Sequence, residues 1–398
     1  MAGPLDGVRV LDLTTMVSGP LATMMLADQG ADVIKIEPPQ GELMRKVGVD
    51  NRGMTSAFLC NNRGKRSLAV DIKSADGLEI VKKLAATADV LVQNFRPGAI
   101  ERMGLGEDVV RALRPDIIYV SISGFGDTGP YAQQRVYDPV IQALSGLADI
   151  QTDRKTGEPR MVRTVISDKT TSLTAAQAIT AALFARERSG GGQHVRLAML
   201  DAMVAYLWPE GSAGLSFVGQ EIDPAHGQSG LDLVFPTKDR HITAGAVTDA
   251  EWAGLCQAIK RPDLLDDPRF KTAGDRARNV AVRREITSAE IAKWPSADIL
   301  ARLRAHDVPA APILTRVELL DDAQVIENGI ITLHDDPDLG TLRQPRPAAR
   351  FDQTPVDFRV TAPFLGADNL NLLTEIGFSA DDVERLTDAG VLRERHPE

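Results

Sequence analysis

Short apolar runs alternate with amphipathic segments through the first third of the chain. This alternation is typical of strands and helices that follow one another in a parallel sheet. The apolar runs predict strands at 8–13, 32–36, 67–72, 90–93 and 117–121. Helices are predicted between them at 20–28, closed by Gly30, and from Ser74 as N-cap to Ala86. The sequence therefore predicts an α/β fold with a Rossmann-like, doubly wound, mostly parallel sheet.

The rest of the chain predicts the end of this large domain and a smaller α+β domain. The longest helical pattern runs from Asp168 to Arg188, and a strand at 195–200 and a helix from Asp201 follow it. A segment rich in Gly, Ser and Pro at 211–229 predicts a linker. Beyond it, the pattern predicts strands at 231–235 and 241–246 and helices at 249–259, 276–292 and 297–305.

These elements define the domain boundaries that we expect. The large domain covers 1–215 and is completed by 335–398, where a helix-containing tail follows a Pro-rich stretch at 344–347. The small domain covers 230–325. The segments 216–229 and 326–334 are predicted as linkers.

Composition and charge narrow the class of protein. With 43% hydrophobic and 25% charged residues among 398, the chain is typical of a soluble globular protein. A net charge of −10 disfavours nucleic acids and anionic membranes as partners. Because the sequence shows no secretory signal pattern and no run of about 18 uncharged apolar residues, we expect no secretion and no membrane span.

The residues that usually bind metals are scattered. Cys60 and Cys256 are far apart, and the six histidines show no paired spacing, so we predict neither a disulfide framework nor a metal site. The cysteine usage favours a reducing, cytoplasmic setting. The segment 124–129 fits G-x-G-x-x-G, but Pro130 and Tyr131 follow where a helix should begin. We therefore predict a flexible loop near a site there rather than a dinucleotide site.

Basic residues cluster beside the ends of predicted strands. Arg63, Lys65, Arg66 and Lys73 bracket the third strand, and the sequence Asn-Phe-Arg-Pro-Gly at 94–98, with Arg102 beyond, follows the fourth. Ligands of open α/β sheets bind at the carboxyl ends of strands, where guanidinium groups hold phosphates. A solvated basic face is the alternative, although Phe95 favours a ligand with phosphates and a flat ring. By sequence alone, Asp168 is an N-cap.

Several segments, in order, resemble one enzyme family over almost the whole chain. They are PLDGVRVLD at 4–12, GADVIKIE at 30–37, NFRPG at 94–98, SGFG at 123–126, DDPRF at 266–270, VPAAP at 308–312 and APFLG at 362–366. The chain resembles the class III CoA-transferases, the family of formyl-CoA and carnitine CoA-transferases that also includes α-methylacyl-CoA racemase. The resemblance implies an interlocked homodimer, no permanently bound cofactor, and an acyl-CoA and a small carboxylic acid as substrates.

The resemblance also implies roles for particular residues. Asp168 falls on the catalytic carboxylate of the family, and Tyr137, Gly124 and Gly126 would support the active site. The family's CoA-binding segments fall on Met16, Val17, Ser18, Val70, Lys73, Asn94, Phe95, Arg96, Arg102 and Arg135. Two positions depart from the family: Pro38 replaces an arginine, and Val17 replaces a polar residue. The glycine-only loop of formyl-CoA transferases is missing, which argues against that substrate.

The choice between CoA transfer and racemisation depends on one position. A racemase needs two bases on opposite faces of the α-carbon, and the position of the family's racemase histidine holds Tyr137. Tyrosine, with an ordinary pKa near 10, is a poor base at neutral pH, which favours transfer. An acyl-CoA racemase and a catalytically silent CoA-binding protein remain as alternatives. For transfer, the family pattern implies that Asp168 forms a mixed anhydride and then an aspartyl-CoA thioester, with amides of 124–129 as candidate oxyanion donors.

Overall fold

The computed structural model describes residues 3–153, 156–209, 211–221, 233–356 and 359–394. The chain divides into two compact units. Unit 1 consists of Met1–Leu207 and Gly329–Glu398, and unit 2 is Trp208–Asn328. The chain therefore leaves unit 1 after Leu207 and returns to it at Gly329.

Unit 1 is built on a six-stranded sheet in the order β5-β2-β1-β6-β7-β8. All neighbouring strands are parallel, which confirms the predicted mixed α/β fold with a mostly parallel sheet. The strands are β1 (Arg9–Asp12), β2 (Asp32–Glu37), β5 (Arg66–Ala69), β6 (Val90–Gln93), β7 (Ile118–Ser123) and β8 (His194–Ala198). Their apolar runs are continuous because helices cover both faces of the sheet.

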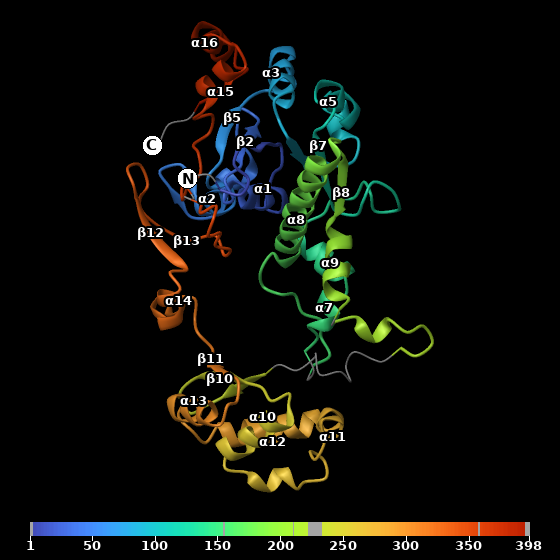
Figure 1. Ribbon diagram of the computed structural model, residues 1–398, viewed down its shortest axis with the longest axis vertical. Helices are drawn as coiled ribbons and strands as arrows, with labels where there is room; N and C mark the ends of the chain where they lie inside the picture. The colour runs from blue at the N-terminus through green and yellow to red at the C-terminus, as the bar shows by residue number, and fades with distance from the viewer. Residues whose placement is uncertain (1–2, 154–155, 210, 222–232, 357–358, 395–398) are drawn as a thin grey trace. The chain divides into compact units, whose positions relative to one another are not determined.

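Helices cover the two faces of this sheet (Figure 1). One face packs against α1 (Ser18–Ala27) and α8 (Ile166–Ser189). The other face packs against α3 (Ala75–Ala85), α5 (Glu107–Leu113), α15 (Asn369–Glu375) and α16 (Ala380–Asp388). Ser74 caps α3 as predicted, because its hydroxyl accepts a hydrogen bond from the Gly77 amide at 3.0 Å.

The strand order changes direction between β1 and β6. The chain runs from β1 to β2 on one side and later places β6 on the other side of β1. Loops that leave the carboxyl ends of such a pair diverge, and the crevice between them is the usual ligand site of an open α/β sheet. Here these loops are residues 13–17 after β1 and 94–98 after β6.

Unit 1 contains further short elements outside the six-stranded sheet. They are η1 (Leu43–Lys46), β3 (Asp50–Asn51), β4 (Met54–Thr55), α2 (Ser56–Asn62), α4 (Ala99–Arg102), α6 (Asp138–Leu144), α7 (Leu147–Ile150), α9 (Met199–Leu207), β12 (Ile331–Asp336) and β13 (Gly340–Pro345). The β12–β13 hairpin is tied to β3, because the Asn51 amide donates to the Leu339 carbonyl at 2.8 Å. The predicted linker 326–334 overlaps regular structure at its start and end, since it contains the end of α14 (Ala323–Glu327) and the start of β12.

Unit 2 has its own core. An antiparallel sheet in the order β11-β10-β9, made of Ala310–Pro312, His241–Ala244 and Val234–Pro236, packs with α10 (Asp249–Ala258), α12 (Val280–Ile291) and α13 (Ser296–Ala305). Among its described residues, unit 2 also contains the short helices η2 (Ala213–Leu215), η5 (Pro262–Leu265), α11 (Ala273–Arg278), η6 (Glu318–Asp321) and α14 (Ala323–Glu327). The predicted single helix 276–292 is wrong, because the chain breaks at Asn279 between α11 and α12. Residues 231–232 of the predicted strand lie outside the described residues.

Candidate active site

Asp168 lies inside the first turn of α8 and not before it. The N-cap is Val165, so the N-cap interpretation of Asp168 is wrong. The cap comes instead from Asp138, the first residue of α6. One oxygen of its buried carboxylate accepts hydrogen bonds from the Ser167 amide at 2.6 Å and the Asp168 amide at 3.1 Å. Asp138 therefore satisfies the exposed amides at the start of α8, a role that our sequence analysis missed.

The carboxylate of Asp168 is directed to the start of a second helix. It forms hydrogen bonds with the hydroxyl and the backbone amide of Ser18, the first residue of α1. No side chain caps α1 from its N-cap position, Val17. The Ser172 hydroxyl joins the two helices, since it lies 2.7 Å from the carbonyl oxygens of both Ser18 and Asp168. The amino-terminal ends of α1 and α8 thus meet at the carboxylate of Asp168, and helix amino termini favour negative charge.

The environment of Asp168 makes its carboxylate more basic than usual. Burial and the negative charge of Asp138 raise the pKa of Asp168 from 3.8 to about 6, while the hydrogen bonds from Ser18 oppose the shift. Above pH 6 the group is mostly ionised. A carboxylate that is ionised at neutral pH and poorly solvated is suited to act as a nucleophile or a base.

The predicted supporting residues lie in the segment that precedes α6. Gly124 has no room for a side chain, because a Cβ there would lie 2.5 Å from the Val136 side chain. Gly126 has a φ of +85°, and its amide donates to the Ser123 hydroxyl at 2.9 Å, so that amide is already engaged. Tyr137 is the N-cap residue of α6, directly before Asp138, and its side chain is exposed. No helix begins within 124–129, as expected for a loop.

The predicted CoA-binding loops meet at the crevice between β1 and β6. Met16, Val17 and Ser18 follow β1, and Asn94 and Phe95 follow β6. The side-chain oxygen of Asn94 accepts a hydrogen bond from the backbone amide of Thr15 at 2.9 Å, and the side-chain nitrogen of Asn94 donates to the Thr15 carbonyl at 2.9 Å. Asn94 therefore links the two loops.

The predicted basic residues fall into two groups. Arg63, Lys65 and Arg66 lie before or at the start of β5, away from its carboxyl end, and form ion pairs. Their partners are Asp28 at 2.6 Å, Asp12 at 2.7 Å and Asp32 at 2.7 Å, respectively. Arg63 and Lys65 are buried, so both the phosphate-binding interpretation and the solvated-face interpretation are wrong for them.

The second group is different. Lys73, Arg96, Arg102 and Arg135 are exposed, and no ion pair joins them to another residue within the described ranges. They are therefore accessible to an anionic ligand. Val70 is fully buried, and its backbone pairs with Leu392 in an isolated β-bridge, so its assignment to CoA binding stays a prediction.

A cavity of about 380 Å³ adjoins the carboxyl ends of β6 and β7. Phe95, Arg96 and Gly98 line it, together with a row of hydrogen-bonded side chains that the sequence did not indicate. In that row Gln93 bonds to Ser121 at 2.8 Å, Ser121 to His194 at 2.8 Å, and His194 to Glu107 at 2.5 Å. No local spacing could reveal it, because its members come from separate elements. This row of side chains fixes the cavity wall behind Phe95, whose backbone amide donates to the Gln93 side chain at 2.8 Å.

The comparison with known proteins assigns a class to this arrangement. The family model of CoA-transferase family III matches residues 5–369, and the chain belongs to this family. The protein is thus a CoA-transferase, and CoA thioesters are its substrates.

Particular relatives match nearly the whole chain. It is 35% identical to succinyl-CoA:glutarate CoA-transferase of Mus musculus, over 98% of this chain and 91% of the relative. It is 34% identical to succinate–glutarate CoA-transferase of Agrobacterium fabrum, over 94% of this chain and 96% of the relative. A crystal structure of a CAIB/BAIF family protein from Brucella suis matches with a TM-score of 0.81 and 31% identity, over 94% of this chain and 100% of that chain.

Among the described residues, no helix has the length and apolar character needed to cross a bilayer. The same residues contain no group of three or more His, Cys, Asp or Glu side chains placed to hold a metal ion.

Proposed function

We propose that the protein transfers CoA between an acyl-CoA and a free carboxylic acid, with Asp168 as the covalent nucleophile. The observation that carries this proposal is the environment of Asp168. Its carboxylate is poorly solvated, has a pKa of about 6, and accepts hydrogen bonds from Ser18 beside the crevice between β1 and β6. Transfer needs a carboxylate that attacks a carbonyl, and this carboxylate is ionised at neutral pH.

The first half of the reaction loads CoA onto the enzyme. An oxygen of Asp168 attacks the thioester carbonyl of the donor, and the CoA thiolate leaves, which produces a mixed anhydride. The thiolate then attacks the aspartyl carbonyl of the anhydride. The donor acid leaves as a carboxylate, and Asp168 carries CoA as a thioester.

The second half repeats these steps in reverse with another acid. The acceptor carboxylate attacks the aspartyl thioester and expels the thiolate, and the thiolate then attacks the acceptor's carbonyl. Asp168 is released as a carboxylate. Charge develops on a carbonyl oxygen in each step, and Ser18 is the donor that we place nearest to the aspartyl oxygens.

We assign CoA binding to the predicted large domain, 1–215 with 335–398. The four exposed cations, Lys73, Arg96, Arg102 and Arg135, supply positive charge for the phosphates, and Phe95 supplies an aromatic surface for the adenine. Lys73→Ala and Arg102→Ala should each raise KM for the acyl-CoA severalfold at low salt, with a smaller effect at high salt. Arg269→Ala in unit 2, whose partner Asp267 is local, is the matched control. Equal KM values for all three variants would contradict the assignment.

We further propose that the exchanged acids are dicarboxylates. The relatives are named for succinyl-CoA and glutarate, which both carry a second carboxylate. Arg163 and Lys169 are exposed on either side of Asp168 in the sequence and provide charge for that group. Lys169 also donates to the Thr164 hydroxyl at 2.9 Å.

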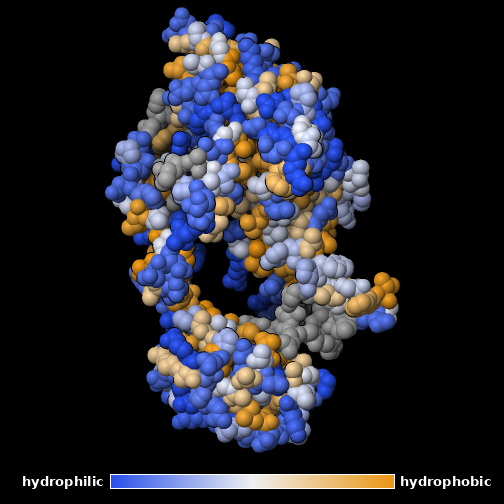
Figure 2. All heavy atoms as spheres, viewed as in Figure 1, coloured by the Kyte–Doolittle hydropathy of each residue, from blue (hydrophilic) through white to orange (hydrophobic). Residues whose placement is uncertain are grey.

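We also propose that the chain works as a homodimer. Leu173 and Phe184 on α8 are 60% and 64% exposed, and Figure 2 shows hydrophobic residues in the part of unit 1 that contains this helix. Large apolar side chains on a long helix favour burial against a partner, and a second copy of the chain is the partner that the family resemblance implies. Sedimentation should give twice the mass of one chain, and a stable monomer would contradict this proposal.

An exchange assay tests the function directly. The enzyme is incubated with succinyl-CoA and a panel of free mono- and dicarboxylic acids in deuterated water, and the products are resolved by mass. We expect new acyl-CoA thioesters from the dicarboxylates without deuterium at the α-carbon. Deuterium in the recovered succinyl-CoA would indicate racemase chemistry, and binding without either product would indicate a silent CoA-binding protein.

A further inference from the structure

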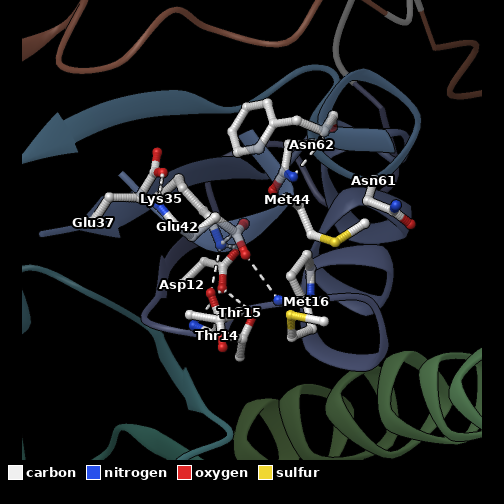
Figure 3. A network of polar contacts seen from close by, with 12 residues as sticks. Asp12, Thr14, Thr15, Met16, Lys35, Glu37, Glu42, Met44, Asn61 and Asn62 are labelled. Carbon is white, nitrogen blue, oxygen red and sulfur yellow. Dashed lines mark hydrogen bonds and ion pairs between the residues drawn. The ribbon is translucent and has the colours of Figure 1, made fainter. Parts of the chain in front are cut away.

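A buried ion pair lies beside the loop that joins β1 to α1 (Figure 3). Lys35 of β2 and Glu42 have fully buried side chains, and Lys35 Nζ lies 3.0 Å from Glu42 Oε1. The other oxygen of Glu42 accepts a hydrogen bond from the Met16 amide at 2.8 Å. Met16 has a φ of +71°, a left-handed conformation that is unfavourable for a residue with a side chain. Glu42 therefore stabilises a strained turn.

The rest of this loop is also held by side chains. The Thr14 amide donates to Asp12 Oδ1 at 2.9 Å, and the Thr14 carbonyl accepts from Lys35 Nζ at 2.5 Å. Both backbone groups of Thr15 bond to the Asn94 amide. Each backbone polar group from the Thr14 amide to the Met16 amide thus has a side-chain partner. The buried charges, and not a backbone ladder, set the conformation of this loop.

The loop leads directly to the active site. Ser18, whose hydroxyl and amide bond to the Asp168 carboxylate, lies two residues after Met16. A turn that changes at Met16 displaces the start of α1 and with it both hydrogen bonds. The position of Ser18 relative to Asp168 therefore depends on Glu42.

We propose that Glu42, paired with Lys35, is a positioning residue for CoA transfer: it fixes the Met16 turn and so presents Ser18 to the Asp168 carboxylate. The inference rests on the proposed function, in which Asp168 is the nucleophile. Neither residue stands out by its spacing in the sequence, because Lys35 lies within the buried strand β2 and Glu42 follows that strand, directly before η1.

The interpretation of a pH experiment depends on the charged groups that face the Glu42–Lys35 pair and those that face Asp168. Lys35 and Lys65 face Glu42, and Asp12 and Glu37 face Lys35. Asp138 on α6 and Ser18 on α1 face Asp168. If Glu42 acted on Asp168 through its charge, removal of that charge would lower the pKa of Asp168. If Glu42 acts by positioning, its removal weakens the hydrogen bonds from Ser18 and raises that pKa. The two effects have opposite signs.

The experiment compares the pH dependence of kcat/KM for Glu42→Ala, Glu42→Gln and the parent enzyme, with succinyl-CoA and glutarate as probes. We expect the acid limb of Glu42→Ala to move upward by about one pH unit, which lowers kcat/KM about fivefold at pH 6 and much less at pH 8. Glu42→Gln keeps an oxygen for the Met16 amide, so its limb should move upward by about half as much. If Glu42→Ala does not fold, the acid limb of the pH dependence of kcat/KM for Glu42→Gln provides the test.

A matched control separates positioning from loss of stability. Arg63→Met breaks another buried ion pair, with Asp28 at the far end of α1. It should lower the unfolding midpoint without moving the acid limb. An unmoved or lowered limb in both folded Glu42 variants, or an equal shift in Arg63→Met, would overturn the inference. Full activity of Asp168→Ala would instead overturn the proposed function, so the two failures are distinguishable.

Discussion

Two aspartates that contact α1 have opposite acidity, although burial acts in the same direction on both. Asp12, at the end of β1, is fully buried, and burial alone would raise its pKa. Lys35 and Lys65 outweigh that effect and hold the pKa of Asp12 well below its usual range. Asp168, at the start of α8, has no cation among the groups that shift its pKa. Burial and Asp138 raise its pKa to about 6.

The difference lies in how fully each carboxylate is bonded. The oxygens of Asp12 accept hydrogen bonds from Thr14, Thr23 and Lys65 at 2.5–2.9 Å. Asp168 accepts from Ser18 alone among the groups that affect its pKa. A carboxylate saturated with donors contributes to structure and is a weak nucleophile, whereas one left underbonded keeps its basicity. The fold thus places a structural and a reactive aspartate against the same helix, α1.

The largest expected effect is on activity. Asp168→Ala should lower the rate of CoA exchange at least about 10⁴-fold, because no other carboxylate replaces the nucleophile. The exchange of labelled glutarate into glutaryl-CoA measures the rate. Asp149→Ala, at an exposed position of α7, is the control. Comparable rates in the two variants would show that Asp168 is not the nucleophile.

The next effect is on stability. Asp12→Asn should lower the free energy of unfolding by about 3–5 kcal/mol, because it leaves Lys35 and Lys65 without their shared partner. The pKa of Lys65 is already lowered to about 8 by burial, against which Asp12 acts. Urea denaturation measures the change. Asp32→Asn, in partly exposed ion pairs with Arg66 and Arg9, should cost much less. Equal losses would remove the distinction between the two sites.

Removal of the charge of Asp168 should raise the free energy of unfolding, the opposite of the effect expected at Asp12. Because the pKa of Asp168 is raised in the fold, the folded state binds more protons than the unfolded state between pH 3.8 and 6. Ionisation of Asp168 therefore destabilises the fold as pH rises through this window. Asp168→Asn should be more stable than the parent by about 1–3 kcal/mol at pH 7.5 and nearly equal to it at pH 4. A variant that is no more stable at pH 7.5 would contradict the shift.

The smallest effect concerns the neighbour of Asp168. Asp138→Asn removes the like charge but keeps an oxygen for the amides of α8, so the pKa of Asp168 should fall. The acid limb of kcat/KM, near pH 6 in the parent, should move downward by less than about one unit. Asp149→Asn should leave it in place. An upward movement would mean that the capping contact outweighs the repulsion between the two carboxylates.

Local features were predictable from the sequence, and long-range partners were not. The bounds of β6 and the Ser74 cap of α3 follow from apolar runs and from a serine before a helix. The sequence predicts Asp168 as the N-cap of α8, because the start of the helix is visible in the local pattern. Its actual partner, Asp138, lies on another helix and carries no local signal. Only the folded chain brings the two together.

The basic residues show the same limit. Arg63, Lys65 and Arg66 form a dense positive cluster in the sequence, which suggested phosphate binding. Their acidic partners lie far away along the chain, so the cluster is neutralised only in the fold. Whether a charged residue is buried depends on partners that the fold brings from distant parts of the chain. Lys73, by contrast, is exposed after the third strand of the sequence pattern, where the sequence predicts it.

The covalent intermediate on Asp168 tests the central claim most directly. The enzyme is incubated with succinyl-CoA without an acceptor acid, quenched with hydroxylamine, and digested for mass analysis of the peptide that contains residues 165–169. The account predicts a hydroxamate on Asp168 in the parent enzyme, none on Asp12 or Asp138, and none in this peptide of Asp168→Ala. An unmodified Asp168 in an enzyme that exchanges CoA, or a label on another side chain, would contradict it.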